Sequence, residues 1–111
     1  MNTVTVTLKV INGKNDEFLQ TIRSLRERLK HEEGFFKCTV YQDVTDESTF
    51  NLIEEWTSQD TLDNHLKSDL FGVLIGALKV LSKESEVRYH LVSQKEGAKV
   101  VEITDDQALL K

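Results

Sequence analysis

The amino-acid sequence predicts a single α+β domain in which helices cover one face of an antiparallel sheet. Three observations support this fold class. Segments that alternate apolar and polar residues predict strands, and segments with an apolar residue every three or four positions predict helices. The two kinds follow one another in the ferredoxin-like order β-α-β-β-α-β. The length, 111 residues, is that of one domain.

The first strand is expected over about residues 3–11, because β-branched residues alternate there with threonines. Asn12-Gly13 predicts a turn, and Asn15 or Asp16 is expected to cap the next helix. Gly34 is expected to end that helix. Its apolar stripe consists of Phe18, Ile22, Leu25 and Leu29.

A hairpin is predicted next, from two alternating segments at about 35–44 and 50–56 with a polar turn over 45–48. In the first of these strands, Cys38 has the same parity as Phe36 and Val40, so we expect it to be a small core residue.

Two helices follow the hairpin, and Ser58 and Ser68 are their expected N-caps. His65 lies on the apolar side of the first of these helices. In the second, Gly72 and Gly76 are one turn apart and are expected to allow a close approach by a neighbouring helix. The core stripe of this second helix consists of Phe71, Leu74, Leu78 and Leu81.

The C-terminal part predicts a strand over about 86–92 and a possible fifth strand over 98–104. We therefore expect a domain over residues 1–94 and an extension over 95–111. The extension could add a strand to the exposed edge of a second copy of the chain.

Composition excludes several classes of function. The net charge is −5 and the pI is about 5.2, so the chain has no general attraction to nucleic acid or to anionic membranes. The longest uncharged apolar stretch, Leu70 to Leu78, is too short to span a bilayer. One cysteine cannot form an internal disulfide, and the first residues do not resemble a signal peptide. We expect a cytoplasmic protein.

The sheet face away from the helices is unusually apolar for a solvated surface. Tyr41, Ile53 and Val92 have the parity of that face, which the helices cannot cover. The simplest explanation is a homodimer that packs the same face of two copies together. The alternative is a monomer with a mixed, wet face.

The chain also lacks the usual signatures of metal and nucleotide sites. Its three histidines do not have the spacing of a metal-binding motif, and the five glycines do not form a phosphate-binding loop. We therefore expect neither a metal nor a cofactor.

The segment Phe50–Ser58, with Glu54-Glu55-Trp56 at the end of its strand, is followed by a helix containing His65 and by Phe71. This pattern resembles the antibiotic biosynthesis monooxygenase superfamily over about residues 3–93. The resemblance implies a dimeric α/β barrel in which two ferredoxin-like sheets face each other.

The resemblance also implies a choice between three chemistries: oxidation of aromatic molecules by O₂ without metal or flavin, haem degradation, and isomerisation. In the haem-degrading members a histidine binds the iron at the position of Ile75, so this chain lacks that ligand. In the polyketide-type oxygenases an asparagine lies beside the pocket tryptophan at the position of Leu52.

The candidate catalytic residues are His65 and Trp56, and the candidate substrate-binding residues are Tyr89 and Phe71. Cofactor-independent oxygenation needs a base that deprotonates an electron-rich substrate, and histidine suits that task. Trp56 would form a pocket wall and donate its indole N–H. In the alternative interpretation His65 binds a backbone carbonyl at the helix end, and the aromatic residues are plain core.

These residues predict a small cofactor-independent monooxygenase-like enzyme that acts on an aromatic or quinol-type molecule. The expected partners are a second copy of the chain and a small apolar or aromatic molecule. Two alternatives stay open: a proton-transfer isomerase on the same scaffold, and a non-catalytic small-molecule-binding or stress-related dimer.

Overall fold

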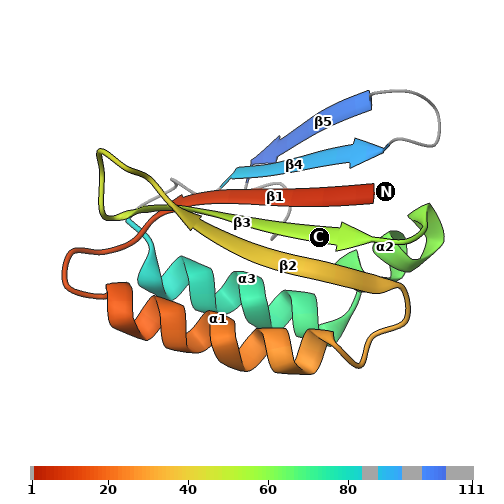
Figure 1. The fold of residues 1–111 in the computed structure, drawn as a ribbon, viewed down its shortest axis with the longest axis horizontal. Coiled ribbons are helices and arrows are strands. Elements are labelled where there is room, and N and C mark those ends of the chain that lie inside the picture. Colours follow the sequence, from red (N-terminus) through yellow and green to blue (C-terminus); the bar gives the residue numbers. More distant parts are fainter. Residues whose placement is uncertain (1, 84–87, 94–98, 105–111) are drawn as a thin grey trace.

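The computed structural model describes the backbone of residues 2–83, 88–93 and 99–104 and the side chains of residues 2–83. Eight elements lie in this part of the chain (Figure 1). They are β1 (Asn2–Lys9), α1 (Asn15–Leu29), β2 (Phe35–Gln42), β3 (Thr49–Trp56), α2 (Gln59–Leu66), α3 (Asp69–Leu81), β4 (Arg88–Ser93) and β5 (Lys99–Thr104).

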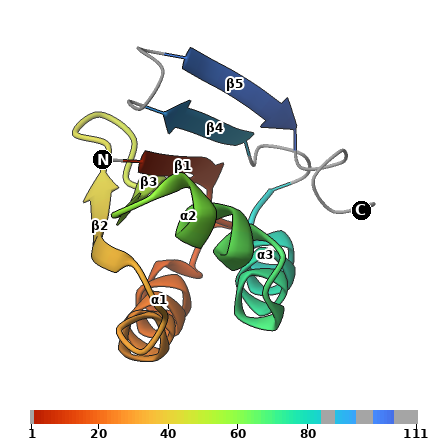
Figure 2. The same ribbon diagram turned by 90° about the vertical axis from the view of Figure 1, so that its right-hand side faces the viewer.

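The strands form one open antiparallel sheet in the order β2-β3-β1-β4-β5. The helices α1 and α3 run side by side under one face of the sheet, and α2 lies at its end (Figures 1 and 2). The predicted α+β class and ferredoxin-like order are therefore confirmed. Among the described elements, α2 and α3 together take the place of the second helix of that order.

The fifth strand pairs with β4 of the same chain, from Arg88 opposite Thr104 to Ser93 opposite Lys99. The division of the chain at residue 94, and the pairing of the extension with a second copy, stay predictions.

The core lies between the sheet and the helices. Burial alternates along β1 and β3, so that one face of each strand is buried against the helices. The stripes predicted for α1 and α3 are both buried. The buried side chains of β1 and β3 include Val4, Val6, Leu8, Phe50, Leu52 and Trp56.

The predicted N-caps of α2 and α3 are confirmed, and the predicted N-cap of α1 is not. Ser58 accepts a hydrogen bond from the Thr61 amide, and Ser68 caps α3 in the same way. The predicted cap of α1 is wrong, because the helix begins at Asn15 with Lys14 before it and no side-chain cap. The Asn15 amide instead donates to the Glu47 carbonyl at 2.9 Å, which ties the helix to the β2–β3 turn.

Three glycines do not have their predicted roles. The helix α1 ends at Leu29, and Gly34 forms the turn into β2 with a φ of 84°. The Thr61 side chain occupies the space that a Cβ on Gly34 would need. A Cβ on Gly72 or Gly76 would meet nothing within 4 Å, because both glycines lie on the exposed side of α3.

The prediction that Phe36 shares the core face of β2 with Cys38 is wrong, because a β-bulge interrupts the alternation. Phe35 lies opposite Trp56 and Lys37 opposite Glu55, so Phe36 is the extra residue. Phe35 therefore packs against the core, whereas Phe36 is 57% exposed. Cys38 is buried, as predicted.

The outer sheet face is partly exposed where its side chains are described. Tyr41 is 54% exposed and Ile53 is half-buried. Among the described residues, no helix is long and apolar enough to cross a membrane.

Candidate functional site

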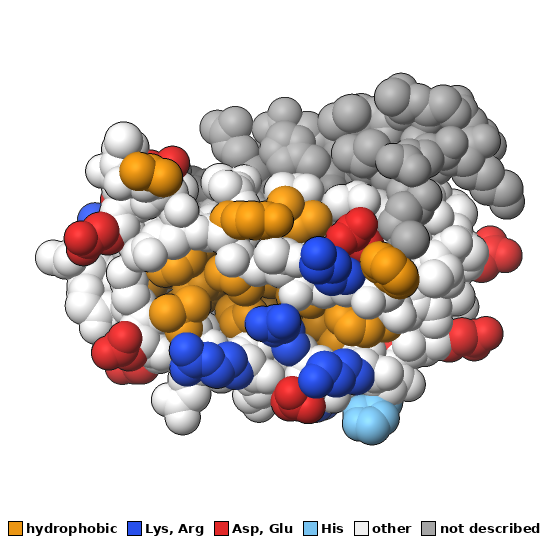
Figure 3. All heavy atoms as spheres, in the orientation of Figure 1, with side chains coloured by type: hydrophobic (Ala, Val, Ile, Leu, Met, Phe, Trp, Pro, Cys, Tyr) orange, Lys and Arg blue, Asp and Glu red, His pale blue; other side chains and the backbone are white. Residues whose placement is uncertain are grey.

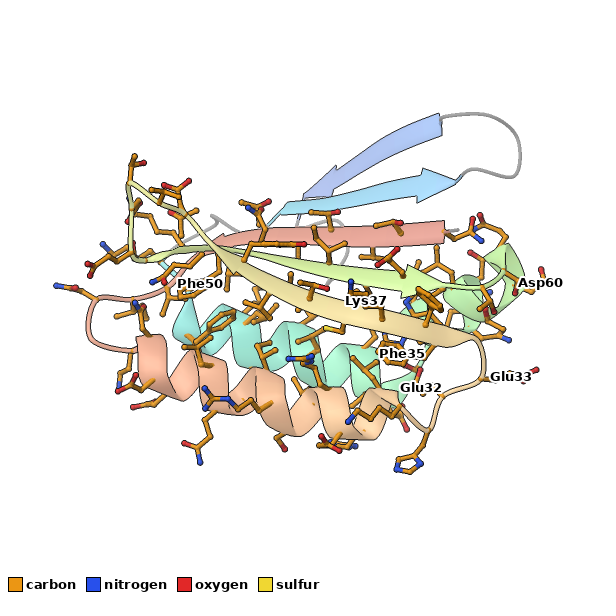
Figure 4. The ribbon with its side chains drawn as sticks, viewed as in Figure 1. Glu32, Glu33, Phe35, Lys37, Phe50 and Asp60 are labelled. Carbon is orange, nitrogen blue, oxygen red and sulfur yellow. The ribbon has the colours of Figure 1, made fainter. Side chains whose placement is uncertain are left out.

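Four separate segments converge at one end of the gap between sheet and helices. The alternation of β3 directs Glu54 and Trp56 to its core face. The inner side of α2 contributes His65, and the first turn of α3 contributes Phe71. Glu32 comes from the turn between α1 and β2, which Figure 4 shows near Phe35.

The aromatic side chains form a compact cluster around His65. The Trp56 and His65 rings stack, with centroids 4.3 Å apart and planes 26° apart. Phe71 meets the His65 ring edge-on at 5.1 Å, and Phe35 meets Trp56 edge-on at 5.6 Å. The bulge in β2 is what brings Phe35, rather than Phe36, into this contact.

Two carboxylates hold the His65 ring from opposite sides. Nδ1 lies 2.9 Å from Glu32 Oε1, and Nε2 lies 2.8 Å from Glu54 Oε1. The Trp56 indole N–H donates to the same Glu54 oxygen at 3.2 Å. The His65 side chain is fully buried and that of Glu54 is 1% exposed, whereas that of Glu32 is 24% exposed.

The short contact between His65 and Glu54 lacks the geometry of a hydrogen bond, and it becomes an ion pair when His65 is protonated. Nε2 has no hydrogen-bond partner among the described residues despite its short distance to the carboxylate. The second oxygen of Glu54, Oε2, has no described partner either. A buried carboxylate is strongly disfavoured unless a positive charge compensates it, and a protonated His65 provides that charge.

The two carboxylates control the protonation of His65. Burial by itself lowers the pKa of His65, but the contacts with Glu54 and then Glu32 outweigh it, so the pKa is raised above its ordinary value. His65 therefore holds its proton to a higher pH than a free histidine. Cys38 pairs with Glu54 across β2 and β3, and burial together with the Glu54 charge raises the pKa of Cys38 to about 12, so this thiol stays protonated.

Hollows lined by described residues lie elsewhere in the fold. Three such hollows all lie away from His65 and Trp56. One of about 440 Å³ lies between α1 and α3, and one of about 410 Å³ follows β2 beside α1. The third, of about 10 Å³, is an apolar void between Cys38, Leu52 and Glu54.

Three of the four candidate residues meet in this site. His65 is in contact with Trp56 and Phe71. The side chain of Tyr89 lies outside the described part, and the structure gives only its backbone pairing with Val6 on β1 and Ile103 on β5. The roles assigned to the four residues stay predictions. Within residues 2–83 no group of histidine, cysteine and acidic side chains could hold a metal ion.

Sequence reasoning missed Glu32 and Glu54. Glu54 had a signal, because it occupies a core position between Leu52 and Trp56 in an alternating strand, where a charge requires a partner. No sequence pattern pointed to Glu32, since it lies in a turn whose path depends on the whole fold. The alternative interpretation gave His65 a backbone carbonyl as its partner, whereas the structure places these two carboxylates at its ring nitrogens.

Comparison with known proteins agrees with this architecture. A protein of Synechocystis named only as uncharacterized (sll1783) is 24% identical over 88 residues, which cover 78% of this chain and 60% of that relative. The chain thus spans less than two thirds of that relative's length.

Two crystal structures show the same fold. A conserved protein from Methanosarcina mazei superposes with a TM-score of 0.75 at 28% identity, covering 85% of this chain and 92% of that one. SnoaB, described as a cofactor-independent oxygenase from Streptomyces nogalater, superposes with a TM-score of 0.70 at 19% identity. The match covers 85% of this chain and 93% of SnoaB.

The sequence pattern of one family also extends across most of the chain. The model of the family "antibiotic biosynthesis monooxygenase" matches residues 1–75, which include Glu32, Glu54, His65 and Phe71. The chain therefore belongs to the antibiotic biosynthesis monooxygenase family.

Proposed function

We propose that the protein is a cofactor-independent monooxygenase that acts on an aromatic or quinol-type molecule. Family membership supports a monooxygenase-like function, and one observation supports this particular chemistry. In the sheet–helix gap, a buried histidine is stacked on a tryptophan and held between two carboxylates. Such a histidine is fixed in orientation, and its proton affinity is set by its neighbours.

In this reaction the protein supplies a base, and no cofactor takes part. A base removes a proton from the electron-rich substrate, and the resulting carbanion or phenolate passes one electron to O₂. The two radicals combine to a peroxide anion, which takes the proton back from the base, and the hydroperoxide then loses water to give a carbonyl product. His65 is the proposed base, and the faces of Trp56 and Phe71 would hold the flat substrate.

The raised pKa of His65 gives this proposal a definite pH dependence. Only neutral His65 can accept a proton, so activity should increase as the pH rises through the raised pKa. The indole N–H of Trp56 already donates to Glu54, so this N–H is expected to fix the carboxylate, and only the face of the ring would contact the substrate.

The functional unit in this proposal is a homodimer. The helices leave the outer sheet face uncovered, and Tyr41 on that face is 54% exposed. A second copy packed on the same face would cover it, and the sheet–helix gap of each protomer would stay available for a ligand.

The proposal is tested by O₂ consumption with anthrone-type and hydroquinone substrates at pH 6 to 9. We expect uptake above background for the native protein, a loss of at least about tenfold in His65→Ala, and no change in His31→Ala, which removes an exposed histidine. Circular dichroism checks that both variants are folded. Absence of uptake by the native protein, with ligand binding unchanged in His65→Ala, would refute the proposal.

The burial of His65 favours a second candidate, a non-catalytic small-molecule-binding dimer. The His65 side chain is fully buried, and both ring nitrogens face carboxylates. Binding without turnover, equal in native protein and His65→Ala, would support it. A proton-transfer isomerase would instead form product in the absence of O₂, with loss of that activity in His65→Ala.

A further inference from the structure

The hollow beside β2 has a charge opposite to that of the whole chain. It lies along the edge strand of the sheet, next to the C-terminal half of α1. Three of its lining residues are the cations Arg26, Lys30 and Lys37, and none is acidic. The chain itself has a net charge of −5, so this concentration of positive charge is local.

Two of these cations have no partner of opposite charge within residues 2–83. Lys30 forms an exposed ion pair with Glu27 at 3.0 Å. Arg26 and Lys37 form no ion pair with any residue of the described part of the chain. Both side chains are exposed, so they are free to bind an anion from solution.

The apolar part of the hollow comes from the β-bulge. The extra residue of the bulge, Phe36, is 57% exposed, which is unusual for a phenylalanine on a strand. Phe35 and Val40 line the same hollow. In the space-filling view, apolar and basic side chains lie next to one another over α1 and β2 (Figure 3), and Lys37 stands on β2 beside Phe35 (Figure 4).

Some of the residues that line the hollow also contact the His65 cluster or line the small void beside it. Phe35 lines the hollow and packs edge-on against Trp56. Arg26 and Cys38 line both the hollow and the small void beside Glu54. One layer of side chains therefore separates the hollow from the buried acid–histidine cluster.

We infer that the hollow between α1 and β2 is a binding site for a small organic anion with a flat apolar body, such as an aryl carboxylate. Arg26 and Lys37 bind the carboxylate, and Phe36 packs against the ring. The volume of about 410 Å³ suits a one- or two-ring molecule. This site goes beyond the proposed function, since it requires binding and no reaction.

The test is calorimetric titration of the full chain with 2-naphthoate and with the uncharged 2-naphthamide. We expect 2-naphthoate to bind more tightly than the amide, and its affinity, but not that of the amide, to fall between 50 and 500 mM NaCl. The double variant Arg26→Gln/Lys37→Gln should weaken 2-naphthoate about tenfold. Phe36→Ala should weaken both ligands.

Two control variants separate the site from general effects. Lys14→Gln/Lys79→Gln removes the same charge from exposed positions outside the hollow, and Val80→Ala removes an exposed apolar side chain from α3. Both should bind 2-naphthoate like the native protein. Equal affinity for acid and amide, an equal loss in the charge control, or no binding at millimolar concentration would each overturn the inference. Because O₂ consumption is measured separately, failure here leaves the proposed function standing, and the reverse also holds.

Discussion

Glu54→Gln tests the charge balance of the buried cluster most directly. The substitution keeps the shape of the side chain and an oxygen that can accept from the Trp56 indole. It removes the negative charge 2.8 Å from His65 Nε2, in a site where the two side chains are 1% exposed or less. Breaking one side of a buried ion pair costs about 3–5 kcal/mol. Since Glu32 still faces Nδ1, we expect a loss of about 3 kcal/mol in the free energy of unfolding.

The loss should depend on pH, and the sign follows from His65. Its pKa is raised in the folded state, so protonated His65 stabilises the native protein fully below its unfolded-state pKa of about 6.5. That contribution is lost as the pH rises through the folded-state pKa. Glu54→Gln lowers the folded-state pKa, so it should destabilise the protein more at pH 5.5 than at pH 9.

Urea unfolding at these two pH values measures the effect, and NMR titration of the His65 ring measures its pKa in both proteins. Glu55→Gln is the matched control, because Glu55 is the next residue on β3 and lies on the opposite, half-exposed face. It should change stability by less than about 0.5 kcal/mol. A Glu54→Gln protein as stable as the control, or one with the same loss at both pH values, would refute the argument.

Three further predictions concern neighbouring features. Glu32→Gln should lower the His65 pKa less than Glu54→Gln and cost about 1 kcal/mol, because this carboxylate is 24% exposed, and the same NMR and urea measurements apply. Gly34→Ala should cost at least about 1 kcal/mol more than Gly13→Ala in thermal or urea unfolding. Both glycines have a positive φ, but only at Gly34 would the new Cβ collide with Thr61. Truncation after Gln94 should raise the dimer dissociation constant in analytical ultracentrifugation, and an unchanged constant would contradict a role of the extension in pairing.

The sequence alone could predict the order of the elements and the meeting of three site residues. Period-two alternation fixed the core face of β3, which contains Trp56, and helical periodicity fixed the inner side of α2, which contains His65. These patterns are local, and burial of one face is enough to enforce them. The position of Phe71 followed from the restart of the helix at Ser68, whose cap the structure confirms.

The bulge in β2, the partner of His65 and the hollow beside β2 depend on contacts between distant residues, which leave no local sequence pattern. The bulge in β2 exchanges the faces of Phe35 and Phe36, and an inserted residue of this kind does not disturb apolar alternation enough to be recognised. The contact of Glu32 with His65 joins residues 33 positions apart, across a turn and two strands. The hollow beside β2 combines side chains of α1 and β2, so its charge became visible only when the two elements were placed together.

The buried pair of Glu54 and His65 can serve either the stability of the fold or its function, and a double substitution separates the two. Replacing a buried ion pair by apolar residues of similar volume is often neutral or stabilising, whereas removing one partner is strongly destabilising. The double variant Glu54→Met/His65→Leu should therefore be more stable than Glu54→Gln, although it leaves the Trp56 N–H without its acceptor, at a cost of about 1–3 kcal/mol. It should also lose O₂ consumption. Urea unfolding and O₂ uptake of the same samples separate the two roles. If the double variant unfolds as easily as Glu54→Gln, the charges serve the fold itself, and the cluster no longer supports a catalytic function.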